Sequence, residues 1–168
     1  MAIADRTISE WLSRVAQPSP VWAAGSVAAM VCAEGWALMH MVAGLAAKRT
    51  PAEVLSAAQE RARAAQDALT RCAADDAEAV RAMVKIPGPD TFARAAEIPL
   101  RVFHWARQGQ ELADLPELTG YEPAALDLAS CRTLFAAALS IAQSLVQANA
   151  AQLDGDSRRI FLAQLDDV

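Results

Sequence analysis

The chain has 168 residues, a length that suits one domain with a substantial core and argues against two. It is 54% hydrophobic but only 5% aromatic, so we expect an interior built from Ala, Leu and Val, as is typical of helical proteins. The net charge of −5 and the pI near 5.0 disfavour nucleic acid and anionic membranes as partners, because both attract clustered Lys and Arg.

Three widely spaced cysteines, Cys32, Cys72 and Cys131, include no CxxC pair, and the chain has only two histidines, His40 and His104. The sequence therefore predicts neither a disulfide framework nor a metal site. The opening residues MAIADRTISE lack a basic segment followed by an apolar one. We expect no secretory signal and a cytoplasmic location.

The first predicted element is a short amphipathic helix that starts at Thr7 and ends before Pro18. Thr7 and Glu10 have the spacing of a capping box, in which each side chain binds the backbone of the other residue. Four apolar side chains follow at helical intervals: Ile8, Trp11, Leu12 and Val15.

The stretch from Pro20 to Ala47 is almost wholly apolar or small. About 20 apolar residues can cross a bilayer, but the run is rich in Ala, Gly, Met and Val, has Glu34 in its middle and lacks a basic flank at its start. We therefore predict no membrane partner and a helix that is buried on every side in a helical protein. Ser26 is the expected N-terminal cap of this helix. The helix is expected to end near Lys48, because a positive charge suits the C-terminal end of a helix dipole.

The remaining helices are predicted from start and stop signals. Thr50 is expected to cap the third helix, and Asp90 the fourth, which contains Pro99 and should bend near Ile98. Gly155 is expected to close the fifth helix and to separate it from a short terminal one. The predicted ranges are 51–86, 91–115, 123–153 and 157–165.

Long helices joined by short loops predict an all-α fold, an antiparallel up-and-down bundle of about five to six helices around a long buried central helix. We treat residues 1–168 as one domain. The apolar central helix needs more cover than one such chain readily supplies, so a homodimer is expected.

The opening residues, TISEWLSRVAQPSPVWAAGSVAAMVCAEGWALMHMV, combine a short helix, a turn and an Ala-rich helix. Further segments of interest are DDAEAVRAMVKIP (75–87), AAEIPL (95–100), ALDLAS (125–130) and Asn149. Taken in order, these segments resemble the formimidoyltetrahydrofolate cyclodeaminase and methenyltetrahydrofolate cyclohydrolase family, whose members start with a short helix, a glycine-rich turn and an Ala-rich helix. The resemblance covers nearly the whole chain.

The resemblance implies an enzyme that forms or opens the 5,10-methenyl bridge of tetrahydrofolate, with a tetrahydrofolate derivative as its substrate, a small-molecule folate partner and no tightly bound cofactor. Asp127 is then the acid or base, because proton transfer must occur near the one-carbon unit. Without the resemblance, Asp127 is a favourable charge at a helix N-terminus.

Five other residues are candidates for substrate binding. Gly25 and Ser26 open the central helix, where free N–H groups suit a carboxylate or an oxyanion. Asn149 needs a partner if buried, either a pterin edge or another helix. Asp76 belongs either to the site or to a solvated face. Lys48, with Arg49 beside it, either attracts a polyglutamate tail or balances the helix dipole.

The chain departs from the family pattern in the turn, where only Gly25 and Ser26 remain and Ala23 and Ala24 replace glycines. Leu145 stands where the family often has asparagine. Alanine suits neither positive φ nor a close approach to a ligand. Two alternatives therefore stay open, namely a catalytically inactive binding or scaffolding subunit and an enzyme that acts on a different ligand.

Overall fold

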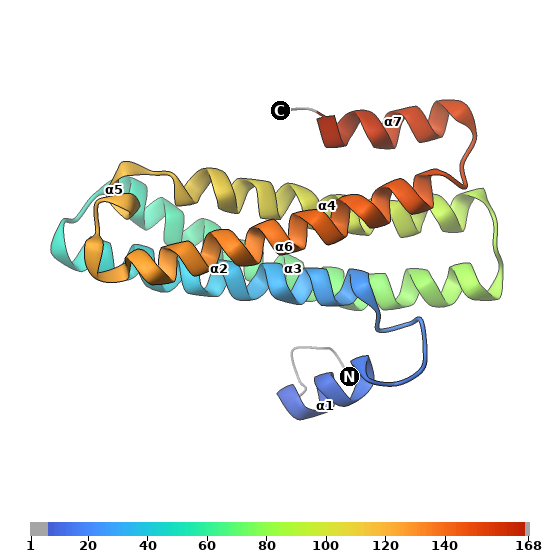
Figure 1. Ribbon diagram of the computed structural model, residues 1–168, viewed down its shortest axis with the longest axis horizontal. Helices are drawn as coiled ribbons and strands as arrows, with labels where there is room; N and C mark the ends of the chain where they lie inside the picture. Colours follow the sequence, from blue (N-terminus) through green and yellow to red (C-terminus); the bar gives the residue numbers. More distant parts are fainter. Residues whose placement is uncertain (1–6, 167–168) are drawn as a thin grey trace.

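The computed structural model describes residues 7–166, which form helices joined by turns and loops, without strands. Four long helices make a bundle whose successive members run antiparallel (Figure 1). They are α2 (Ala24–Arg49), α3 (Glu53–Lys85), α4 (Pro89–Ala113) and α6 (Ala125–Ala150). The shorter elements are α1 (Ile8–Val15), α5 (Pro116–Thr119), the 3₁₀ helix η2 (Glu122–Ala124) and α7 (Gly155–Asp166). The all-α, up-and-down architecture is confirmed.

Each long helix packs along two neighbours, so that α2 lies between α3 and α6, and α4 lies on the other side between the same two helices. Helix α7 folds back over α4 and α6, while α1 lies outside the bundle, near the start of α2 (Figure 1). No side chain of α1 is buried.

The apolar helix α2 is buried on one side only. Its inward side chains, among them Trp36, Met39 and Val42, are fully buried. Its outward stripe is exposed and has helical spacing: Glu34, Ala37, Met41, Leu45 and Lys48. The expectation that this helix is buried on every side is therefore wrong for a single chain.

The capping predictions succeed at α1 and fail elsewhere. The Thr7 and Glu10 capping box is present. Helix α2 starts at Ala24, so Ser26 lies inside the helix and does not cap it. Thr50 ends α2, and α3 follows Ala52 without a side-chain cap. The reason is Pro51, which favours an extended backbone at the residue before it; Thr50 has φ −136° and ψ 92°.

Helix α4 also starts differently from the prediction. It follows Gly88, whose N–H donates to Thr91 Oγ1 at 3.1 Å, so Thr91 and not Asp90 supplies the side-chain oxygen. Pro99 lies inside the helix as predicted. Gly155 is the first residue of α7 and does not close the preceding helix.

Two helical segments are long and apolar enough to cross a membrane by length and composition alone. In Ala24–Arg49 half of the apolar window is buried inside the bundle, and in Glu122–Ala150 only 28% is. Core helices of soluble proteins pass the same test, so this finding mainly shows how much apolar surface α2 and α6 leave open.

Candidate functional site

The predicted site residues lie in two groups at different levels of the bundle. Gly35 of α2 packs directly against Leu134 and Phe135 of α6. Ser26 comes nine residues before Gly35, and Asp127 eight before Phe135, on helices that run in opposite directions. At 1.5 Å per residue, Ser26 and Asp127 are therefore separated by about 25 Å along the bundle. Within one chain they share no site.

The first group is a buried polar corner at the start of α2. Ser26 is fully buried, and Asp76 of α3 is 5% exposed. Ser26 Oγ lies 2.9 Å from Asp76 Oδ2 and 3.0 Å from the carbonyl oxygen of Ala73. The interpretation of Asp76 as part of a solvated face is wrong, whereas Glu78 is exposed and pairs with Arg94.

Burial raises the pKa of Asp76, while hydrogen bonds from the Ser26 hydroxyl and backbone N–H oppose the shift. Both protonation states find partners in this corner. The ionised carboxylate accepts the Ser26 hydroxyl, whereas the protonated form can donate to Ser26 Oγ, which then donates to Ala73. Such a carboxyl group can exchange a proton without leaving a buried atom unpaired.

Gly25 allows Asp76 to approach α2 closely. A Cβ atom at position 25 would lie 2.1 Å from Asp76 Oδ1, closer than real contacts allow. The carboxylate of the chain itself thus occupies the helix N-terminus, where an external anion was expected to bind. Three of the candidate residues, Gly25, Ser26 and Asp76, therefore lie together and contact one another.

Asn149 lies towards the same end of the bundle as Ser26. Its Nδ2 donates to the carbonyl oxygen of Ala95 in α4, at 2.9 Å. Of the two partners considered from the sequence, a pterin edge or another helix, the structure provides the helix.

Trp22, in the altered turn before α2, also contacts other side chains. Its ring meets Trp11 edge-on, with centroids 5.9 Å apart. The guanidinium groups of Arg14 and Arg81 lie 5.8 and 5.7 Å from its centroid. Trp22 therefore joins α1 and α3 beside the polar corner.

The second group lies at the opposite end. Asp127 is half-buried in the first turn of α6, and Lys48 is exposed in the last turn of α2. Neither side chain forms a hydrogen bond or ion pair with another residue in the range 7–166. Burial, together with the charge of Asp127, raises the pKa of the Cys131 thiol to about 11, so Cys131 is a core residue and no nucleophile.

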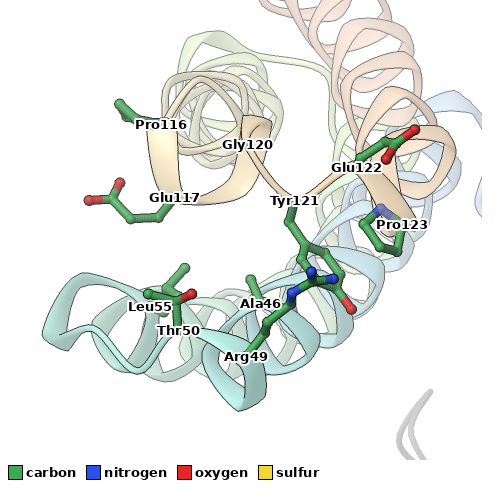
Figure 2. A pocket seen from close by; sticks show the side chains of 10 residues that line it. All are labelled: Ala46, Arg49, Thr50, Leu55, Pro116, Glu117, Gly120, Tyr121, Glu122 and Pro123. Carbon is green, nitrogen blue, oxygen red and sulfur yellow. The ribbon is translucent and has the colours of Figure 1, made fainter.

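A cavity of about 390 Å³, here called the end pocket, opens beside this second group (Figure 2). Asp127 and Lys48 do not line it, but Glu122 and Arg49, close to them in sequence, do. Its ten lining residues are Ala46, Arg49, Thr50, Leu55, Pro116, Glu117, Gly120, Tyr121, Glu122 and Pro123. The sequence did not predict this pocket, although Pro116 begins α5 and Pro123 is the second residue of η2.

A second cavity, of about 710 Å³, lies between α4 and α7 and contains none of the predicted site residues; Glu97, Arg101 and His104 line one side of it. His40 accepts a hydrogen bond from Arg63 Nε at 3.1 Å, as a structural histidine does. Within residues 7–166, no three His, Cys, Asp or Glu side chains come together in a way that would hold a metal ion.

A comparison with known protein families identifies the family of this chain. The formiminotransferase-cyclodeaminase family model matches residues 7–163. The chain belongs to this family. The family resemblance seen in the sequence is thereby confirmed.

Among solved structures, a formiminotetrahydrofolate cyclodeaminase from Thermotoga maritima has the same fold. The TM-score is 0.91 at 21% sequence identity, over 98% of this chain and 89% of that one. At this identity the likeness is one of fold. No curated protein sequence matches the chain.

Proposed function

We propose that this cyclodeaminase-family protein is a folate one-carbon enzyme that forms or opens the 5,10-methenyl bridge of tetrahydrofolate, as a cyclodeaminase or a cyclohydrolase. The family match over residues 7–163 carries this proposal. A half-buried Asp127 without a hydrogen-bond partner among the described residues supports it, because both reactions need a group that can exchange a proton.

In ring closure, N10 attacks the carbon of the N5-formimidoyl group and loses its proton, and the bond from that carbon to the departing nitrogen breaks. The group reacts as its protonated amidinium form, whose nitrogen already carries two hydrogens; Asp127 takes the N10 proton and gives it to this nitrogen, which leaves as ammonia. In the cyclohydrolase direction water attacks the bridge carbon and gives one proton to Asp127, the bond from that carbon to N5 breaks, N5 takes the second proton of the water, and Asp127 releases its proton to the solvent. Asp127 lies in the first turn of α6, at the end of the helix that carries the positive partial charge of the backbone dipole.

The other candidate residues take different roles in this proposal. Lys48, exposed near the same end, attracts the carboxylates of the glutamate tail. Gly25, Ser26, Asp76 and Asn149 support the fold around α2 and α4. Ser26 binds Asp76 and the backbone of Ala73, Asn149 binds the backbone of Ala95, and Gly25 leaves the space that Asp76 occupies. Substrate contact at these four residues would require those bonds to open.

A second candidate function is a binding or scaffolding subunit without catalysis, and a related one is catalysis on a different ligand. One observation favours them: the start of α2, where the family has its glycine turn, is filled by Asp76, and Ser26 is fully buried. A substrate-binding site at that turn would therefore be blocked in this chain.

We also propose a homodimer. Met41 and Leu45 of α2 are 40% and 37% exposed, and Leu126 of α6 is 86% exposed. These two helices pack side by side. Large apolar surface of this kind marks interaction sites, and a second copy would cover it by two-fold symmetry.

Turnover and binding measurements distinguish these functions. The protein is mixed separately with 5-formimidoyltetrahydrofolate and 5,10-methenyltetrahydrofolate, and the methenyl absorbance is followed. We expect turnover of one of them and a loss of about a hundredfold or more in kcat for Asp127→Asn. Full activity of that variant would remove the catalytic assignment.

The scaffold alternative predicts no turnover of either compound. A folate at one hundred times its dissociation constant should raise the free energy of unfolding by about 2.7 kcal/mol. Stabilisation without turnover would favour the binding subunit, and neither stabilisation nor turnover would favour the scaffold or a different ligand.

A further inference from the structure

The wall of the end pocket is held in place by the turn between α4 and α6. The N–H of Gly120 donates to Pro116 at 2.9 Å, that of Tyr121 to Leu118 at 3.2 Å, and that of Ala124 to Tyr121 at 3.1 Å. Leu118 is 1% exposed and anchors α5 in the core. A wall fixed before binding loses little conformational freedom when a ligand enters.

The inner surface of the pocket is apolar. Ala46 and Leu55 are 3% and 1% exposed, and Tyr121 is half-buried beside them. The volume of about 390 Å³ lies in the range of small-molecule pockets and is sufficient for a bicyclic ring system. This lining suits the face of a flat ring.

The rim of the end pocket is polar and carries charged side chains. Arg49, Glu117 and Glu122 line the pocket, and none of these side chains forms a hydrogen bond or ion pair with another residue of the described range 7–166. Figure 2 shows the Arg49 side chain reaching towards Tyr121, with Glu122 on one side of Tyr121 and Glu117 on the other, and both carboxylates directed away from Tyr121. Because the two glutamates are exposed, a change of rotamer can turn a carboxylate acceptor towards the apolar surface beside the Arg49 donors.

This combination matches the edge of a 2-amino-4-oxo ring. Such an edge presents a carbonyl acceptor next to two N–H donors. A guanidinium can donate to the carbonyl, and a carboxylate can accept both N–H groups at once. A ring with an oxygen in place of the 2-amino group would turn an acceptor towards the carboxylate and be rejected.

We propose that the end pocket binds the pterin ring of the folate, with Arg49 at its 4-oxo group, Glu122 at its 2-amino edge and Tyr121 along its face. The proposal rests on the proposed folate function. It implies that the rest of the folate leaves the pocket towards Lys48 and Asp127, which lie at the same end. Guanine has the same edge, so a guanine nucleotide is the other source of this chemistry.

Calorimetry with fragments tests the proposal directly. The probes are 6-methylpterin, 6-methyllumazine (the 2-oxo analogue), p-aminobenzoylglutamate and GMP. We expect 6-methylpterin to bind at least about tenfold more tightly than 6-methyllumazine, because the lumazine keeps only one of the two N–H donors and turns a carbonyl oxygen towards the carboxylate. Equal binding of the two would overturn the assignment. GMP binding tighter than the pterin would assign the pocket to a nucleotide and overturn it as well.

Variants then locate the bound fragment. Glu122→Gln and Arg49→Gln should each weaken 6-methylpterin binding about tenfold or more. The matched control Glu60→Gln removes the same charge at an exposed position of α3 away from the pocket and should change nothing. If p-aminobenzoylglutamate, and not the pterin, is the fragment that depends on Arg49, the pocket holds the other half of folate and the proposal fails.

The outcomes also separate this inference from the proposed function. Turnover of a folate with pterin binding unchanged in Glu122→Gln and Arg49→Gln would leave the enzyme proposal standing and remove the pocket assignment. Pterin binding that depends on both residues, without turnover of any folate, would support the pocket and remove the enzymatic function. Both variants change exposed side chains, so circular dichroism should show the parent fold.

Discussion

Asn149 supplies the hydrogen bond that Pro99 removes from α4. The nitrogen of a proline carries no hydrogen, so Pro99 cannot donate to the carbonyl of Ala95, four residues earlier. The side chain of Asn149 donates to this same carbonyl at 2.9 Å. A polar residue in an apolar helix and a proline in its neighbour thus form one unit across the bundle.

The two residues should therefore be energetically coupled. Asn149→Leu leaves the Ala95 carbonyl without its partner and is expected to lower the free energy of unfolding by about 1–3 kcal/mol. In a Pro99→Ala background the new backbone N–H can satisfy Ala95, so the same change should cost much less. Urea unfolding of the four proteins measures this coupling. An equal cost of Asn149→Leu in both backgrounds would show that the two residues act independently.

Gly25→Ala should destabilise the protein by about 1–3 kcal/mol, because the added Cβ would lie 2.1 Å from Asp76 Oδ1 and force the carboxylate away from Ser26. Gly155→Ala is the matched control, since nothing lies within 4 Å of a Cβ there. Thermal unfolding compares the two variants. A Gly25→Ala protein as stable as Gly155→Ala would mean that Asp76 can move at no cost.

The buried corner should also make stability depend on pH. Burial raises the pKa of Asp76 above its ordinary value of 3.8. Between that value and the raised one, the folded state binds more protons than the unfolded state, so its stability falls as pH rises. Asp76→Asn carries no ionisable group and removes this contribution.

The measurement is the urea midpoint of the parent and of Asp76→Asn across about pH 4 to 8. The stability of the variant relative to the parent should increase with pH through this window. A constant difference at every pH would mean that Asp76 titrates in the folded protein as it does in the unfolded chain.

The sequence was sufficient for the long helices because its breakers are strong. Pro87, Gly88 and Pro89 separate α3 from α4, and apolar periodicity carries each helix between such signals. The short elements α5 and η2 were missed, since four or three residues contain too little periodicity to be recognised. The cap predicted at Thr50 was wrong because Pro51 favours an extended backbone at the residue before it, and α3 begins only after Ala52.

The site was less predictable because its contacts join residues far apart in the chain. Asp75 and Asp76 look alike in sequence, yet one helical step separates an exposed ion pair with Arg101 from a buried contact with Ser26. The two residues of that contact are fifty positions apart in the sequence, so no local pattern predicts it. The end pocket likewise forms only when the turn before α6 meets the end of α2.

The exposed stripe of α2 gives the last prediction. If a second copy covers Met41 and Leu45, then Met41→Glu and Leu45→Glu should convert a dimer into a monomer, because each would bury a charge without a partner. Ile160→Glu on α7 is the control, as Ile160 is 62% exposed but lies away from this stripe. Size-exclusion chromatography with light scattering measures the mass of each variant. A parent protein that is already monomeric, or dimers that persist in both α2 variants, would contradict the proposed interface.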